Sequence, residues 1–264
     1  MKSSTFKIVT IAGATGLLGF HIADAFLNDG SYKIKILRQK PESENKNASL
    51  LASKGAETIY VDYNDKDDLV KALKGTDVVI CAIGGHEFIP PQRALFVAAK
   101  EVVEFLQELK KSGMEYTIII DGLFQEYLWV LGFDHKNKKA NLFADGNTKV
   151  VTTALSDVGK YTVESLKLPA ARNGIIRVAG CVLTLNELVQ KFEEVTVSYD
   201  LTVRERYKNN TDPVPALLDD WAAYLVTTLD FKDFHNDKFT FTPRPITDAI
   251  KKILDTSDKK TGYV

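Results

Sequence analysis

The chain has 264 residues, 45% hydrophobic and 26% charged, a composition typical of a globular protein with one large domain or one domain and a smaller partner. Its 34 basic and 35 acidic residues give a net charge of −1, which removes the electrostatic case for a nucleic acid or an anionic membrane as partner. No apolar run reaches the roughly 20 residues that cross a bilayer, and residues 1–7 lack the apolar stretch of a signal peptide, so we expect a cytosolic protein.

The cysteines and histidines indicate neither a metal site nor a disulfide. Cys81 lies inside an apolar strand pattern and Cys181 follows another, so we expect two buried free thiols. The four histidines lie far apart, and none has a cysteine, histidine or acidic residue at ligand spacing. We therefore predict no bound metal.

The most informative stretch is IVTIAGATGLLG at residues 8–19, where an apolar strand pattern is followed by spaced glycines and then by helical periodicity. Gly13, Gly16 and Gly19 suit three tasks in a dinucleotide site: a tight turn, backbone approach to a pyrophosphate, and close packing of helix on strand. The pyrophosphate would lie at the helix N-terminus, where unpaired N–H groups favour anions. The alternative is an ordinary strand–helix turn that binds no nucleotide.

The next strand, expected at residues 32–38, ends in basic rather than acidic residues. A carboxylate about 20 positions beyond the glycines would hold a ribose hydroxyl and favour NAD, whereas an arginine there accommodates a 2′-phosphate. This chain offers Arg38 and Lys40, which favours NADP. The alternative is a solvated basic turn without a ligand.

Alternating strand and helix patterns in the first third of the chain predict an α/β fold with a doubly wound parallel sheet. We expect its fourth strand at residues 77–83, almost continuously apolar as in a sheet that is covered on both faces. Ligands bind at the carboxyl edge of such sheets, so we expect Ala82, Ile83 and Gly84 to pass close to the cofactor.

A long helix at residues 92–112 and a strand at 116–120 are expected next. Lys100 shares a face of that helix with Phe96 and Val103. Apolar neighbours disfavour a charged lysine, which suits the side chain to acid–base chemistry near neutral pH. The alternative is a lysine whose stem covers apolar surface while its ammonium reaches water.

Five segments in their order resemble the NmrA-like, isoflavone-reductase-like proteins, an atypical branch of the short-chain dehydrogenase/reductase superfamily. The segments are GATGLLG, AAKEVVEFL, YTIIIDGLFQEYL, DGNTKVVTTALSDVGKY and IIRVAG, at residues 13–19, 98–106, 116–128, 145–161 and 175–180.

This resemblance implies a Rossmann-type fold with NADP(H) as cofactor. Arg38 and Lys40 match the residues that hold the NADP 2′-phosphate. The phosphate loop would consist of Gly13, Thr15, Gly16, Leu17, Leu18 and Gly19.

The resemblance also implies catalytic and substrate positions. Lys100 matches the lysine that lies near the nicotinamide ribose in the reductases of the family and helps to transfer a proton. Gly122, Phe124 and Tyr127 match the loop that lines the substrate pocket. Classical short-chain dehydrogenases use a catalytic pair of a tyrosine and a lysine four positions later. None of the tyrosines in this chain has a lysine at that spacing, so any reductase chemistry differs from the Tyr–Lys mechanism.

The chain departs from the family pattern after Gly85, where the family has another helix and strand. Either strand 116–120 pairs directly with the fourth strand, or a segment after Gly85 is missing from the sequence. We expect the second, because a parallel sheet does not easily lose an interior strand.

We predict two interleaved lobes, an NADP-binding Rossmann domain at residues 1–123 and a smaller α+β substrate-binding lobe at residues 124–264. In the second lobe we expect a helix at 124–131 and a capping box of Thr184 and Glu187.

Two functions compete. The first is an NADPH-dependent reductase that transfers a hydride to an aromatic or unsaturated or carbonyl-containing small molecule, with Lys100 as proton donor or relay. The alternative is a non-catalytic NmrA-like regulator that senses NADP(H) and acts through a protein partner. Lys100 favours the enzyme, whereas the absent Tyr–Lys pair and the lost strand after Gly85 favour the sensor.

Overall fold

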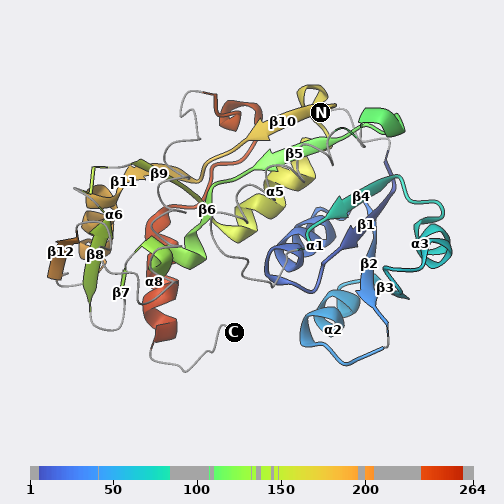
Figure 1. The fold of residues 1–264 in the computed structure, drawn as a ribbon, viewed down its shortest axis with the longest axis horizontal. Helices are drawn as coiled ribbons and strands as arrows, with labels where there is room; N and C mark the ends of the chain where they lie inside the picture. The colour runs from blue at the N-terminus through green and yellow to red at the C-terminus, as the bar shows by residue number, and fades with distance from the viewer. Residues whose placement is uncertain are drawn as a thin grey trace. The chain divides into compact units, whose positions relative to one another are not determined.

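The computed structural model describes residues 6–40, 42–83, 107, 110–131, 133–134, 138–143, 146–147, 149–195, 200–204 and 233–257. Its contacts divide the chain into two units (Figure 1). The first contains residues 1–87 and 155–171, and the second contains residues 88–154 and 172–264. The predicted boundary between lobes at residue 123 stays a prediction.

The first unit contains a parallel sheet of order β3-β2-β1-β4 with helices packed on it, which confirms the predicted Rossmann-type α/β class. Sheets of this kind arise because each strand returns through a helix that covers the apolar side chains of one face. The elements are β1 (Ile8–Ala12), α1 (Leu17–Asp29), β2 (Lys33–Gln39), α2 (Lys46–Ser53), β3 (Glu57–Val61), α3 (Lys66–Leu73), β4 (Val78–Cys81), α5 (Leu155–Ser165) and a 3₁₀ helix (Pro169–Ala171).

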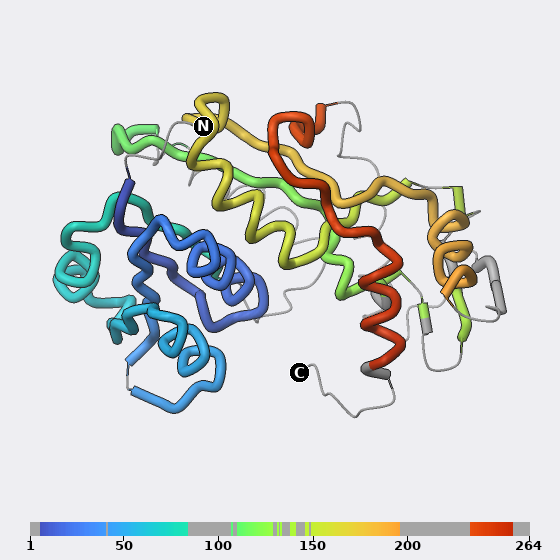
Figure 2. Tube along the Cα trace, turned by 180° about the vertical axis from the view of Figure 1, so that it is seen from behind, coloured from blue at the N-terminus to red at the C-terminus, as the bar shows by residue number. Residues whose placement is uncertain are grey.

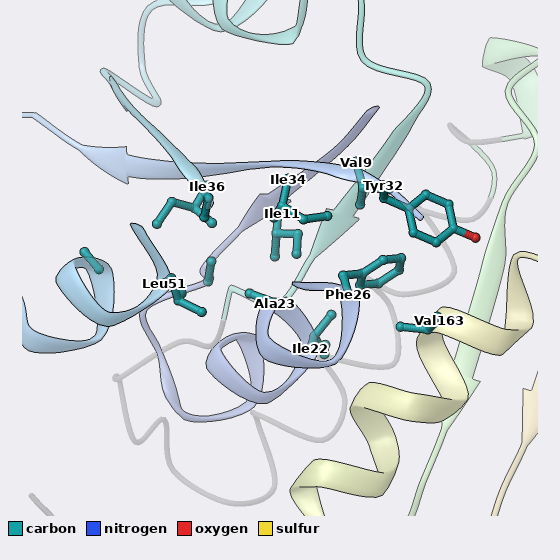
Figure 3. Close-up of a cluster of buried hydrophobic side chains, with 13 residues drawn as sticks. Val9, Ile11, Ile22, Ala23, Phe26, Tyr32, Ile34, Ile36, Leu51 and Val163 are labelled. Atoms are coloured by element: carbon teal, nitrogen blue, oxygen red, sulfur yellow. The ribbon is translucent and has the colours of Figure 1, made fainter. Parts of the chain in front are cut away.

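A core of buried apolar side chains holds α1 against β1 and β2 (Figure 3). Ile11 of β1, Ile36 of β2 and Phe26 of α1 are fully buried. Val163 of α5 joins the same cluster, although it follows the rest of this core by more than a hundred residues. The apolar faces predicted from periodicity therefore meet as expected, and the core fixes the position of the loop between β1 and α1.

Helix α5 packs beside α1 (Figure 2). Gly159 makes this approach close, because a Cβ there would lie 2.5 Å from the carbonyl oxygen of His21. At the far end of the pair, the ammonium of Lys167 donates to the carboxylate of Asp29 over 2.9 Å. Helix α5 lies within residues 124–264, the predicted second lobe, but belongs to the first unit.

Strand β4 is the edge strand of the described sheet, and its side chains alternate between partly buried and exposed. Val79 is 54% exposed and Cys81 is also exposed. The predicted burial of Cys81, and of both faces of this strand, is wrong for this reason. Cys181 is partly buried and is a free thiol.

The second unit contains three small sheets: β5 with β10, the set β11-β9-β6, and the set β12-β8-β7. The described strands do not show the direct pairing of residues 116–120 with the fourth strand, because β5 pairs with β10. The elements are β5 (Thr117–Ile120), β6 (Leu123–Phe124), β7 (Phe133–Asp134), β8 (Lys139–Phe143), β9 (Lys149–Thr153), β10 (Gly174–Arg177), β11 (Cys181–Thr184), α6 (Leu185–Glu193), β12 (Asp200–Arg204), α8 (Ile246–Ser257), and 3₁₀ helices at Gln125–Leu131 and Asn236–Lys238.

The core of the second unit forms between α6, α8 and the 3₁₀ helix Gln125–Leu131. Phe192 and Phe133 stack there with ring centroids 4.6 Å apart. The predicted capping box is confirmed, since the Thr184 hydroxyl accepts from the Glu187 N–H and the Glu187 carboxylate accepts from the Thr184 N–H. The helix expected at 124–131 is instead a 3₁₀ helix that is kinked at Tyr127.

None of the helices in the described part of the chain combines the length and the apolar character that a membrane span requires.

Candidate functional site

The loop between β1 and α1 touches the end of β4 through backbone atoms. Gly13 has φ +81°, a left-handed conformation that only glycine adopts without strain. A Cβ at this position would lie 2.5 Å from the carbonyl oxygen of Ala82 and 2.9 Å from the nitrogen of Ile83. The structure thus brings together three residues that the sequence placed at a cofactor site.

The N-terminus of α1 has no side-chain cap. Gly16 is the N-cap residue, its N–H donates to the Gly13 carbonyl over 3.0 Å, and no acidic residue lies in the first turn. A Cβ at Gly19 would collide with the carbonyl group of Gly13, so helix and loop are in direct backbone contact. The first N–H groups of a helix lack partners within it, and without a cap they are available to an anion.

Some side chains of this loop pack against the core of the first unit, and others are exposed to solvent. Leu18 packs against the core of the first unit, whereas Leu17 is 38% exposed. The carbonyl of Thr15 accepts from the Asn47 side-chain amide of α2 over 3.1 Å, which ties the loop to the next helix. The predicted loop residues therefore form one short structured turn.

Arg38 lies at the end of β2 and is held by several contacts. Its guanidinium donates to the Ser43 hydroxyl over 3.0 Å and to the Tyr60 hydroxyl over 3.1 Å. The same group lies over the Tyr60 ring, 5.3 Å from its centroid. The cation is thereby fixed in orientation without any carboxylate partner among these contacts, which leaves its charge available.

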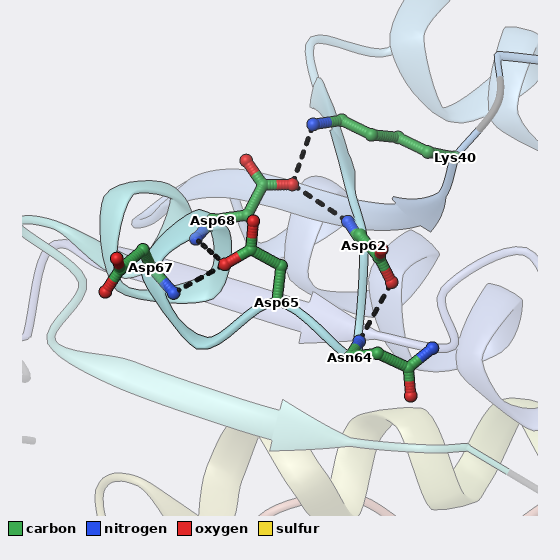
Figure 4. A network of polar contacts seen from close by, with 6 residues as sticks. All are labelled: Lys40, Asp62, Asn64, Asp65, Asp67 and Asp68. Atoms are coloured by element: carbon green, nitrogen blue, oxygen red, sulfur yellow. Dashed lines mark hydrogen bonds and ion pairs between the residues drawn. The ribbon is translucent and has the colours of Figure 1, made fainter.

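Lys40 is paired with an acidic residue of α3 (Figure 4). Its ammonium lies 2.7 Å from Asp68, and the same carboxylate oxygen accepts from the backbone N–H of Asp62 over 2.9 Å. The hydrogen bond between the two side chains raises the pKa of Lys40 and lowers that of Asp68. Arg38 and Lys40, the two basic residues expected at a 2′-phosphate, are thus close in sequence. Lys40 is paired with a carboxylate, whereas Arg38 contacts hydroxyl groups and an aromatic ring.

The three substrate positions implied by the resemblance lie together in the second unit. Gly122 has φ +71°, and a Cβ there would lie 2.5 Å from the carbonyl oxygen of Val151. The rings of Phe124 and Tyr127 are 6.3 Å apart, and Tyr127 packs against the core of this unit. Gly122 therefore permits a close approach of two backbone segments, which no other residue would allow without strain.

A polar cluster near these residues was not predicted as a site. The Gln125 side-chain amide lies 3.5 Å from the Thr152 hydroxyl and 3.8 Å from the Cys181 sulfur, and Gln125 is fully buried. Asp121, immediately before Gly122, is partly buried. Burial raises the pKa of its carboxyl to about 7, against a smaller lowering effect of its own backbone N–H. The sequence offered one indication of this polar cluster, which is that Asp121 directly follows an apolar strand.

Lys100 and Gly84 lie outside the described residues, so their predicted roles stay predictions. Within the described residues, no group of histidine, cysteine and acidic side chains could hold a metal ion.

Comparisons with known proteins agree with the family resemblance that the sequence motifs indicate. Residues 5–105 match the NmrA-like family. Pinoresinol reductase 2 of Arabidopsis thaliana is 29% identical over 246 residues, which cover 74% of this chain and 77% of that protein. Isoflavone reductase of Medicago sativa is 26% identical over 242 residues, covering 72% and 76%. The predicted resemblance to the NmrA-like family is confirmed.

Solved structures show the same fold as this chain. The complex of leucoanthocyanidin reductase with NADPH from Vitis vinifera has a TM-score of 0.79 at 18% identity and covers 94% of this chain and 99% of its own. AtPrR2 with NADP⁺ and (+)pinoresinol has a TM-score of 0.78 at 20% identity, covering 96% and 100%. At these identities the likeness establishes the fold, while the chemistry must be argued from residues.

Proposed function

We propose that this chain is a cytosolic NADPH-dependent oxidoreductase that transfers a hydride to an aromatic or an unsaturated or carbonyl-containing small molecule. The observation that carries the proposal is the glycine loop, where backbone contact at Gly13 and Gly19 leaves no room for side chains and α1 begins without a cap. The relatives named as pinoresinol and isoflavone reductases support the same class of reaction.

The residues present fit a dinucleotide phosphate. The uncapped N–H groups at the start of α1 would bind the pyrophosphate, and Gly13, Thr15 and Gly16 would let it approach the backbone. Arg38 would bind the 2′-phosphate, since its guanidinium is oriented by Ser43 and Tyr60. When bound, NADPH supplies the hydride, which is two electrons and one hydrogen nucleus.

Lys40 would contribute to the same phosphate less strongly than Arg38. Its ammonium must first give up the contact with Asp68, and the negative charge of that carboxylate remains close by. We therefore assign the principal phosphate contact to Arg38. Lys40 would make a second, weaker contact once its ammonium has left Asp68.

The catalytic and substrate roles rest on the resemblance. We propose Lys100 as proton donor or relay, and Gly122, Phe124 and Tyr127 as part of the surface that holds the substrate.

Calorimetric titration of the cofactor-free protein with NADPH and NADP⁺ tests the proposal. We expect both to bind and NADPH to bind more tightly, because a reductase must hold its hydride donor before the acceptor arrives. Equal binding, or a preference for NADP⁺, would favour the alternative of a dinucleotide sensor. A protein that binds neither nucleotide would contradict both functions.

A further inference from the structure

The segment at residues 43–47, which leads into α2, contacts both parts of the first unit to which the proposed function assigns phosphate groups. Ser43 contacts Arg38 at the end of β2, and Asn47 contacts Thr15 in the glycine loop. All of these residues belong to the first unit, and the sequence predicted neither Ser43 nor Asn47 as a site residue. One short segment therefore touches two candidate phosphate subsites.

Asn47 holds one side of the peptide unit between Thr15 and Gly16. Its side-chain amide donates to the Thr15 carbonyl over 3.1 Å, and on the other side the Gly16 N–H donates to the Gly13 carbonyl over 3.0 Å. A peptide unit is planar, so bonds at both of its sides fix its orientation. Helix α1 begins directly after this unit, and its first internal bond runs from the Phe20 N–H to the Gly16 carbonyl. The direction of the preceding N–H groups, which would bind a pyrophosphate, therefore depends on Asn47.

Helix α2 is a fixed support for this contact. Ala48 and Leu51, which follow Asn47 in the helix, are buried in the same core as Ile11 of β1, and Figure 3 shows Leu51 in that core. Asn45 caps the helix, since its side chain accepts from the Ala48 N–H over 3.0 Å. An amide carried by an anchored helix is preorganised for its hydrogen bond with the loop.

Ser43 acts on the other subsite through Arg38. The Arg38 guanidinium donates to the Ser43 hydroxyl over 3.0 Å and to the Ser43 carbonyl over 2.5 Å, in addition to its bond with Tyr60. A guanidinium has five N–H donors, so these three bonds leave donors for phosphate oxygens. Ser43 is exposed, and its hydroxyl accepts from Arg38, so its own proton can be donated to a phosphate that reaches the arginine.

The two contacts are separate from each other. Among the hydrogen bonds of the described residues, none joins Ser43 to the glycine loop and none joins Asn47 to Arg38. The phosphate groups are also distributed differently among ligands. A pyrophosphate is common to NADPH, NADH and ADP-ribose, whereas only NADPH among these three has a 2′-phosphate. A ligand series can therefore read each contact by itself.

We propose that Asn47 and Ser43 are positioning residues for two different parts of the coenzyme, an inference that rests on the proposed function. Asn47 fixes the loop that receives the pyrophosphate. Ser43 fixes Arg38 for the 2′-phosphate. Asn47 thus sets the affinity for every ligand that has the pyrophosphate, and Ser43 contributes to the preference for NADPH over NADH.

Calorimetric titration of the purified protein with NADPH, NADH and ADP-ribose tests the role of Asn47. We expect Asn47→Ala to weaken the binding of all three by a similar factor of about 3 to 10, the loss that one hydrogen bond produces. ADP-ribose lacks the nicotinamide, so its loss places the effect at the loop. Asn47→Gln keeps an amide donor and should recover part of the affinity. A loss confined to NADPH, or no loss for any ligand, would contradict the role of Asn47.

Asn45→Ala is the matched control for Asn47→Ala. It removes the same type of side chain from the start of the same helix, where its described side-chain contact is with Ala48 and not with the glycine loop. The lost cap lowers the free energy of unfolding, which urea unfolding measures, while NADPH affinity should stay within about twofold of the wild type. An affinity loss equal to that of Asn47→Ala would mean that Asn47 acts only through the stability of α2, and its positioning role would fall.

Ser43→Ala tests the second subsite with the same ligands. We expect NADPH binding to weaken by about 2- to 5-fold, because the Ser43 carbonyl still holds Arg38, and NADH and ADP-ribose binding to stay unchanged. Ser43→Thr keeps the hydroxyl and should bind NADPH like the wild type. Ser49→Ala, which removes an exposed hydroxyl from α2, is the control and should change nothing. Equal losses for NADPH and NADH in Ser43→Ala, or no loss for either, would overturn the role of Ser43.

The outcomes separate the inference from the function on which it rests. A wild type that binds NADPH, together with variants that bind all three ligands like the wild type, would overturn both positioning roles and leave the reductase in place. A wild type that binds neither NADPH nor NADH would overturn the proposed function and this inference together.

Discussion

The ammonium of Lys40 and the carboxylate of Asp68 lie 2.7 Å apart, and this pair joins the end of β2 to the start of α3. It therefore places a carboxylate against one of the two cations proposed for a 2′-phosphate, and Asp65 and Asp62 add further negative charge near Lys40. A phosphate that arrives there meets an Arg38 whose described contacts with Ser43 and Tyr60 include no carboxylate, but it must compete with Asp68 for Lys40. Coenzyme preference then depends on an acidic residue that does not itself bind the coenzyme.

We predict that Asp68→Asn strengthens NADPH binding by about 3- to 10-fold at low salt and leaves NADH binding unchanged, because it frees Lys40 and removes a repulsive charge. Calorimetry at low and at high salt measures this effect, which should shrink as salt screens the charges. Asp67→Asn is the matched control, since it removes the same charge from the first turn of α3 without contacting Lys40. An equal gain in both variants would show that only the net charge of α3 matters.

Arg38 should carry most of the preference for NADPH over NADH. We expect Arg38→Met to weaken NADPH binding by about 10- to 100-fold, the range of a charge-assisted contact to phosphate, with little effect on NADH. Lys33→Met, at the start of the same strand, is the control for a lost positive charge. If NADPH and NADH lose affinity equally in Arg38→Met, the arginine has a structural task only.

Gly13 and Gly30 have similar backbone conformations, so substituting each one measures the cost of backbone strain separately from the cost of a steric clash. Gly13 has φ +81° and no room for a Cβ, whereas Gly30 has φ +73° with open space around it. We expect Gly30→Ala to lower the free energy of unfolding by about 1 kcal/mol, and Gly13→Ala by about 2–4 kcal/mol because the clash with Ala82 adds to the strain. Urea unfolding measures both, and equal losses would show that the loop relaxes around the added methyl group.

Local patterns in the sequence predicted the glycine loop and the caps of the helices, because those features depend on neighbouring residues. The turn at Gly13 and the capping box at Thr184 follow from the residues within one helical turn of them. The partner of Lys40 follows it by 28 residues, and α5 returns to α1 across about half of the chain, so neither was visible in local patterns. The burial of Asp121 likewise results from tertiary packing, which no spacing rule describes.

The ion pair of Asp29 and Lys167 should make a small, pH-dependent contribution to stability. Burial opposes ionisation of Asp29, but the hydrogen bonds from Lys167 and Ser31 outweigh it and lower the pKa of the carboxyl. A lowered pKa in the folded state contributes stability that is present above the unfolded pKa of about 4 and is lost as the pH falls further. The side chains of Lys167 and Asp29 are 26% and 20% exposed, and ion pairs that water still reaches contribute little. We therefore expect Asp29→Asn to cost only about 0.5 kcal/mol at pH 7 and nothing near pH 2.

Asp121 should give the opposite dependence on pH. Its pKa is raised to about 7 in the folded state, so the folded protein binds one proton more than the unfolded chain between about pH 4 and pH 7. Stability is therefore fully present below pH 4 and falls as the pH rises through 7. Since each pKa unit corresponds to about 1.36 kcal/mol, the loss reaches at most about 4 kcal/mol.

Urea unfolding of the wild type and Asp121→Asn from pH 4 to pH 8 measures this difference. The neutral asparagine cannot ionise, so the variant should lose stability less steeply as the pH rises and exceed the stability of the wild type above pH 7. Asp255→Asn, which removes an exposed carboxylate from α8, should follow the wild-type curve. Parallel curves for Asp121→Asn and the wild type would mean that the carboxyl is already ionised at pH 5, and that burial does not raise its pKa.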